Sequence, residues 1–162
     1  MVEQSLRKRE VGGSSPSTGT TIQRKAAKSL HTERNRLVPT LVVYLAASFI
    51  HFAHNAEFLG NYPNLPSWIT PSGIYLSWVG LAAIGVSGLI LYLRNRHAVG
   101  LLLVGVYAAF GFDGLIHYSR ASFAEHSVAI NLSIWFEVVA AGALMVVVVT
   151  SAIRRCLAGQ AI

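Results

Sequence analysis

Four apolar runs, each about 20 residues long, dominate this sequence and limit what it can fold into. A helix of that length, rising 1.5 Å per residue, crosses the ~30 Å of hydrocarbon in a bilayer. Because the links between the runs are short, neighbouring helices should run antiparallel. The sequence therefore predicts an all-α, four-transmembrane-helix up-and-down bundle over residues 37–155, with helices at about 37–58, 74–93, 98–118 and 128–153.

Composition agrees with a chain that lies in lipid. Of the 162 residues, 53% are hydrophobic and only 12% are charged, which is too apolar for an ordinary soluble domain. The one cysteine, Cys156, excludes an intramolecular disulfide framework and any Cys-rich zinc or iron–sulfur site. Chemistry is therefore left to histidines, carboxylates and hydroxyls.

The segment before the first run differs in composition from the rest. Residues 1–36 hold eight of the 13 Lys and Arg, together with a Gly/Ser/Pro/Thr stretch at 12–21. Such a composition cannot bury a core, so we expect a disordered basic N-terminal tail, with a short basic helix near residues 22–30 lying on anionic lipid. Residues 156–162 are expected to form a second, short tail.

Basic residues also indicate the orientation of the helices. Apart from the eight in the N-terminal tail, Arg94 and Arg96 lie between the second and third runs, and Arg154 and Arg155 follow the fourth. Only Arg120 falls in a loop of the opposite side. This positive-inside pattern predicts a multi-pass protein of the cell (inner) membrane with both termini cytoplasmic. Since the basic residues flank apolar runs, we expect the lipid bilayer as partner and no nucleic acid.

Chelating and ionisable residues gather at the outer end of three of the four predicted helices. They are His51, His54, Asn55, Glu57, Asp113, His117, His126 and Asn131. Counted at 1.5 Å per residue, His51 lies ~10 Å, Asp113 ~8 Å and Asn131 ~6 Å below the outer membrane boundary. Intramembrane ionisable groups almost always face the bundle interior, so we expect these side chains to meet in its outer third.

The first interpretation of this group is a transition-metal site. Neutral imidazole with carboxylate suits copper, iron or zinc, and bundle cores present such ligands from facing helices. We expect His51, His54, Asp113 and His117 as ligands, completed or oriented by Glu57 and His126 and hydrogen-bonded by Asn55 and Asn131. If the site is catalytic, the expected activity is metal-dependent oxidation of a small or lipid-soluble substrate.

Two other interpretations stay open. Glu137 lies ~15 Å below the outer end of its helix, where it should be protonated or hydrogen-bonded. Beside histidine it could act without metal as general acid or base on a membrane-soluble ligand, or hold two helices together as a polar contact. Alternatively, the chain is a non-catalytic membrane adaptor whose basic tail contacts lipid or a protein partner of unknown identity.

The loop after the first run should fold back over the mouth of the bundle. Pro63, Pro66 and Pro71 prevent a helix there, while Tyr62 and Trp68 prefer the membrane interface. The loop would then cap the polar residues and control access to them.

Two motifs carry resemblances. The run His-x-x-His-Asn-x-Glu-Phe-Leu from His51, the following Tyr-Pro-x-Leu-Pro-x-Trp and the later Asp-Gly-x-x-His-Tyr resemble small bacterial four-helix membrane proteins with an HxxE-type first helix. This resemblance covers residues 40–150 and implies the fold but no activity. Asp113-x-x-x-His117 is also similar to the copper-binding helix in the C subunit of particulate methane monooxygenase, where a second histidine follows after twelve intervening residues, whereas here His126 follows after eight.

Overall fold

The computed structural model describes the backbone of residues 18–62, 64–157 and 159, and the side chains of those residues from Thr32 onward. The chain divides into two compact units, Met1–Thr32 and Glu33–Ile162. In the first unit, the described backbone is the beginning of a helix. The second unit is the helical bundle that holds the candidate site.

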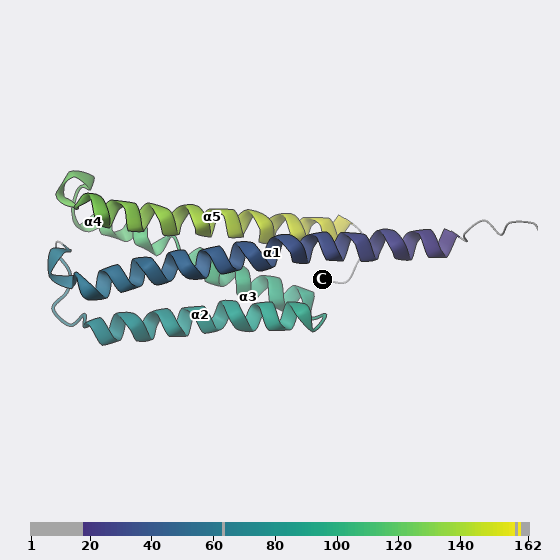
Figure 1. Cartoon of the computed structure of the whole chain (residues 1–162), viewed down its shortest axis with the longest axis horizontal. Coiled ribbons are helices and arrows are strands. Elements are labelled where there is room, and N and C mark those ends of the chain that lie inside the picture. The colour runs from purple at the N-terminus through teal and green to yellow at the C-terminus, as the bar shows by residue number, and fades with distance from the viewer. Residues whose placement is uncertain (1–17, 63, 158, 160–162) are drawn as a thin grey trace, which may run out of the picture. The chain divides into compact units, whose positions relative to one another are not determined.

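All regular structure in the described residues is helical (Figure 1). The α-helices are α1 (Thr18–Glu57), α2 (Pro71–Leu93), α3 (His97–Phe110), α4 (His117–Arg120) and α5 (Val128–Leu157). Short 3₁₀ turns, η1 (Leu59–Asn61), η2 (Asp113–Ile116) and η3 (Phe123–Glu125), occur in the connections. We call the end of the bundle that carries the connections 58–70 and 121–127 the loop end, and the end with the short α2–α3 turn the opposite end.

Four helical stretches are long and apolar enough to cross a membrane: Thr32–Glu57, Pro71–Leu93, His97–Arg120 and Val128–Leu157. They confirm the four predicted helices and are consistent with a multi-pass integral membrane protein. Their outward faces carry large exposed apolar side chains, among them Leu76, Leu102 and Val139. In water such faces would drive aggregation, whereas in a bilayer they meet lipid chains.

α1 begins well before the predicted start of the first span. Residues 18–36, expected in the basic tail, are helical from Thr18 onward, and residues 1–17 lie outside the described part of the chain. The stretch from Arg24 to Leu30 consists mainly of Arg, Lys, Ala and Leu, which have high helix propensity even where they cannot bury a core. Charge and hydropathy therefore predicted the apolar span, not the residue at which the helix begins.

The core of the second unit is formed mainly by α1, α3 and α5. Leu41, Val104 and Leu144 are fully buried representatives of the three helices. α2 lies alongside α3 (Figure 1), where a Cβ on Gly88 would lie only 2.9 Å from the carbonyl oxygen of Gly100. These two glycines therefore let the helices approach closely, as is usual for small residues in membrane bundles.

The third span is broken near the loop end, where the sequence predicted one helix over residues 98–118. α3 ends at Phe110, and the chain continues through Gly111 and Phe112 into η2 and α4. A Cβ on Gly111 would lie 2.5 Å from the Cβ of Ala141 and 2.6 Å from the Tyr44 hydroxyl oxygen. The break therefore occurs where the backbone packs directly against α1 and α5, at a residue with low helix propensity.

A buried ion pair joins α1 and α5 at the opposite end. Arg155 Nη2 donates to Glu33 Oε2 at 2.8 Å, and the Tyr92 hydroxyl donates to the same oxygen at 3.2 Å. The guanidinium also lies over the Tyr92 ring, 5.4 Å from its centroid. From sequence, Arg155 was placed after the fourth run and Glu33 falls within the expected tail, but both are buried and hold three helices together.

Candidate acid–base site

The site is built around two buried side chains from different helices. His51 of α1 and Glu137 of α5 are each only 2% exposed. His51 Nε2 lies 3.6 Å from Glu137 Oε2. Burying a charge away from water is expensive unless it is paired, so a proton that passes from the acid to the imidazole would leave two opposite charges that compensate each other.

Neighbouring hydrogen bonds fix the tautomer of His51. Asn55 Nδ2, one turn along α1, donates to His51 Nε2 at 3.1 Å, which makes Nε2 an acceptor. His51 Nδ1 therefore carries the proton and donates to Ser133 Oγ at 3.2 Å. Ser133 in turn donates to the carbonyl of Ile130 at 2.9 Å. The one lone pair of Nε2 thus accepts from Asn55 in this arrangement, with Glu137 Oε2 3.6 Å away beside it.

That space is a cavity of about 110 Å³, which we call the polar cavity. Besides His51 and Glu137 it is lined by Asn55, Asp113, His117, Gly114, Phe52 and Phe110. Gly114 of η2 forms part of its wall, and a Cβ there would lie 3.6 Å from Glu137 Oε2 and 3.7 Å from His51 Nε2. The break in the third span therefore brings backbone close to the pair and leaves Asp113 at the exposed side of the cavity.

His117 stands between the pair and the loop-end surface. Its ring centroid lies 5.6 Å from that of His51, 5.0 Å from that of Tyr62 and 6.3 Å from that of His126. No residue that the structure describes makes a hydrogen bond with its imidazole nitrogens. His117 is therefore available to a ligand in the polar cavity.

Tyr62 covers this region from the first loop. Its side chain is buried, and its hydroxyl lies 2.8 Å from His54 Nδ1. Burial raises the pKa of Tyr62 to about 12, so the phenol is neutral and donates to the histidine. At Tyr62 the loop therefore folds back over the bundle mouth, as expected. Trp68, later in the same loop, does not: its side chain is 79% exposed.

Three residues of the predicted metal site have other partners. Glu57 is exposed and accepts a hydrogen bond from the Tyr75 hydroxyl at 2.8 Å. His126 is buried and its Nδ1 donates to the carbonyl of Ser122 at 2.9 Å. Asn131 accepts from the Tyr118 hydroxyl at 2.8 Å. These three side chains hold the connections at the loop end in place.

A transition-metal site would require several of these donor side chains to converge on one point. Among the residues that the structure describes, no group of three or more His, Cys, Asp and Glu side chains is placed to hold a metal ion. His54 and His126 each have one ring nitrogen bonded to the protein, and His51 Nε2 accepts from an amide. A hydrogen bond at one ring nitrogen leaves the other free for a metal, but the side chains do not converge on one point in this arrangement, so the metal site stays a prediction.

Two residues of the site were not singled out from sequence, Tyr62 as a partner of histidine and Ser133. A signal for Ser133 exists, since Ser133 and Glu137 are four residues apart and therefore share a helix face. The pairing of Tyr62 with His54 depends on the path of a proline-rich loop. Such a loop lacks the helical periodicity from which the direction of a side chain could be predicted.

Fold and site together describe a multi-pass helical bundle with a buried histidine–carboxylic acid pair beside a small polar cavity. No protein-family model, curated protein sequence or solved structure matches this chain. The two resemblances given above therefore stay predictions, and function has to be argued from the site itself.

Proposed function

We propose that this membrane protein binds an uncharged, lipid-soluble molecule at the loop end and that His51 and Glu137 act on it as an acid–base pair. The observation that carries the proposal is the 3.6 Å approach of His51 Nε2 to Glu137 Oε2 at the wall of a 110 Å³ cavity. A cavity of that size holds a small polar group, so the rest of the ligand must lie elsewhere.

The pair supports chemistry in which only protons move. In the resting arrangement both partners are neutral, with the acid proton on Glu137 and the lone pair of His51 Nε2 accepting from Asn55, a hydrogen bond that the ligand replaces. The ligand gives one proton to Nε2 and receives the Glu137 proton at another atom, which isomerises it without an oxidant or reductant. The two atoms lie 3.6 Å apart, so the proton on Nε2 then returns to Oε2 through one bridging water or after the side chains close to about 3 Å, which restores the neutral pair.

Surrounding residues have supporting roles in this proposal. Ser133 keeps His51 in the tautomer whose free nitrogen is Nε2. Asp113 and His117 line the cavity and can hydrogen-bond a polar ligand group. Tyr62, bonded to His54, covers the imidazoles from the loop side.

The alternative is the predicted transition-metal site, for which His51 Nε2 would have to give up its hydrogen bond from Asn55 and the ligand side chains would have to move together. The acid–base proposal is preferred because it uses the arrangement that the side chains already have. Elemental analysis, described in the Discussion, separates the two.

The proposal also includes orientation: the loop end faces away from the cytoplasm, as the distribution of Lys and Arg predicts. Cys156, the single cysteine, is exposed at the opposite end and serves as a natural reporter. A membrane-impermeant maleimide should label it only in permeabilised cells. A Cys156→Ser/Ser67→Cys variant should be labelled in intact cells, and the reverse pattern would contradict the orientation.

Infrared spectroscopy of the purified protein tests the pair. A protonated carboxylic acid buried in the bundle gives a carbonyl band separate from those of carboxylates, and we assign such a band to Glu137. It should disappear in Glu137→Gln and persist in Glu57→Gln, the matched change at an exposed carboxylate. A parent spectrum without the band, or one that Glu137→Gln leaves intact, would overturn the proposal.

A further inference from the structure

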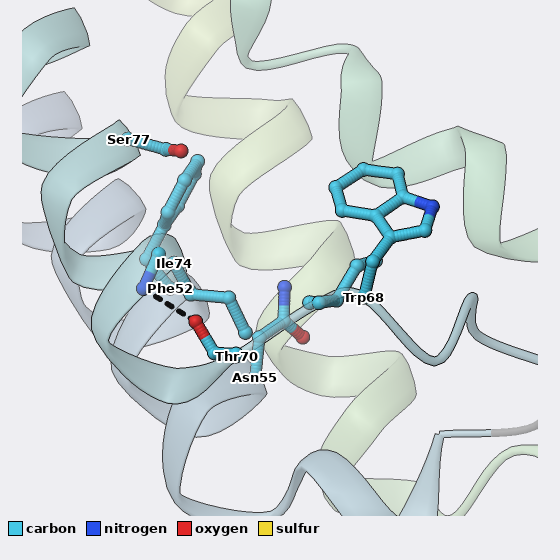
Figure 2. Close-up of a pocket in the computed structure, with 8 residues that line it drawn as sticks. Phe52, Asn55, Trp68, Thr70, Ile74 and Ser77 are labelled. Atoms are coloured by element: carbon cyan, nitrogen blue, oxygen red, sulfur yellow. Dashed lines mark hydrogen bonds between the residues drawn. The ribbon is translucent and has the colours of Figure 1, made fainter.

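A second, larger pocket lies directly beside the polar cavity. Its volume is about 340 Å³, and it lies between α1, the end of the first loop and the first turns of α2. Figure 2 shows Phe52 and Asn55 of α1 together with Trp68, Thr70, Ile74 and Ser77 around it. Volumes of 300–1,000 Å³ are typical of small-molecule sites, and this pocket is lined mainly by apolar surface. We call it the apolar pocket.

The two spaces share a wall. Phe52 and Asn55 line both the polar cavity and the apolar pocket. A molecule with a polar group near His51 and Glu137 therefore has a neighbouring place for an apolar body. This arrangement matches an amphiphile whose polar group is small.

Asn55 indicates what the polar group must be able to do. Its Nδ2 donates to His51 Nε2, but its Oδ1 is buried and has no hydrogen-bond partner among the described residues. A buried amide oxygen without a donor costs about 1–3 kcal/mol, so native structures usually satisfy it. A ligand hydroxyl at the shared wall would supply the missing donor.

Charge at the site limits the ligand further. None of the described residues that line either space is Lys or Arg. An anionic head would therefore meet Glu137 and Asp113 without a compensating cation, within a span that excludes water. A cation would find no buried counter-charge either, because Glu137 is neutral in the proposed function and Asp113 is exposed, so we take the ligand to be uncharged.

We propose that the apolar pocket and the polar cavity form one binding site for an uncharged alcohol or phenol, with its hydroxyl at Asn55 and its apolar body between Phe52 and Ile74. This inference rests on the proposed function and names the class of molecule that the acid–base pair receives. The hydroxyl donates to Asn55 Oδ1 and its oxygen lies within the polar cavity.

Fluorescence quenching tests this site with defined probes. A Trp78→Phe/Trp135→Phe variant of the full chain keeps Trp68, at the apolar pocket, as its one tryptophan. The probe is a bromine-substituted alkylphenol, and the comparison probe is the same molecule without the hydroxyl. We expect saturable quenching by the phenol and at least ten-fold weaker binding of the comparison probe.

Variants locate the binding. Ser77→Phe fills the apolar pocket and should weaken phenol binding at least ten-fold, while Leu76→Phe, the next residue and 71% exposed, should leave it unchanged. Asn55→Ala, which adds no bulk, should weaken the phenol about three- to ten-fold and leave the comparison probe unaffected, as expected for one lost hydrogen bond.

The outcomes also separate the two proposals. Quenching that does not saturate, or that is equal for both probes and insensitive to Ser77→Phe, would overturn the binding site. If the binding site were overturned in this way while the Glu137 carbonyl band was present, the acid–base proposal would remain and only the proposed ligand class, an alcohol or phenol, would be wrong. Phenol binding in a protein that lacks the band would support the site and overturn the acid–base role.

Discussion

Arg155 Nη2 of α5 lies 2.8 Å from Glu33 Oε2 of α1, and both side chains of this ion pair are at most 4% exposed. Breaking such a pair leaves one buried charge uncompensated. We therefore expect Glu33→Gln to lower the free energy of unfolding by about 3–5 kcal/mol, measured by reversible unfolding in mixed micelles. Arg154→Gln, the exposed neighbour, should change it by less than about 1 kcal/mol. Equal effects of the two changes would show that the pair is not a structural contact.

The close packing of the broken third span gives a second prediction. Gly111→Ala places a Cβ against Ala141 and Tyr44, and overpacking of this kind should destabilise the bundle by about 1–3 kcal/mol. Gly142→Ala, a helical glycine with nothing within 4 Å of the added Cβ, should leave stability unchanged or raise it by up to about 1 kcal/mol. Unfolding of both variants under the same conditions checks the difference, and a neutral Gly111→Ala would contradict the packing.

The spans could be predicted from the sequence because the bilayer imposes one length and one kind of side chain on every helix that crosses it. The break at Gly111 could not be predicted, because a glycine alone does not break the helix: α3 is continuous through Gly105. What differs is the neighbour: Ala141 and the Tyr44 hydroxyl lie against Gly111, which only the packed bundle reveals.

Depth along each helix predicted part of the site. His51, Asp113 and His117 were expected at one level, and the structure places all three at the polar cavity. Glu137 was counted about 5 Å deeper than His51 from its Cα position, but its long side chain spans that difference. Glu57 points in a different direction around the axis of α1 from His54, and it pairs with Tyr75. Depth along a helix does not predict this direction.

The phenol of Tyr62 predicts a dependence of stability on high pH. Its pKa is raised from 10.0 to about 12 by burial, so the folded state holds the proton more tightly than the unfolded state. The resulting stabilisation is complete below pH 10 and is lost as the pH rises towards 12, on the order of 2 kcal/mol. Tyr62→Phe should lack this loss between pH 10 and 12. Parallel pH profiles of parent and variant would contradict the buried phenol.

Metal content separates the acid–base proposal from the predicted metal site. We expect protein purified in detergent without chelator to contain no copper, iron or zinc at a fixed ratio. Chelator treatment should leave phenol binding unchanged. Stoichiometric metal that is lost in both His54→Ala and His117→Ala would instead support the transition-metal site.

The central claim is that His51 and Glu137 work as a pair, and nitrogen NMR of the histidines tests it most directly. Selective ¹⁵N labelling with comparison to His51→Ala identifies the His51 signals. We predict a neutral ring protonated at Nδ1, whose Nε2 signal shifts strongly in Glu137→Gln and stays unchanged in Glu57→Gln. An Nε2 signal that is indifferent to Glu137→Gln would contradict the account.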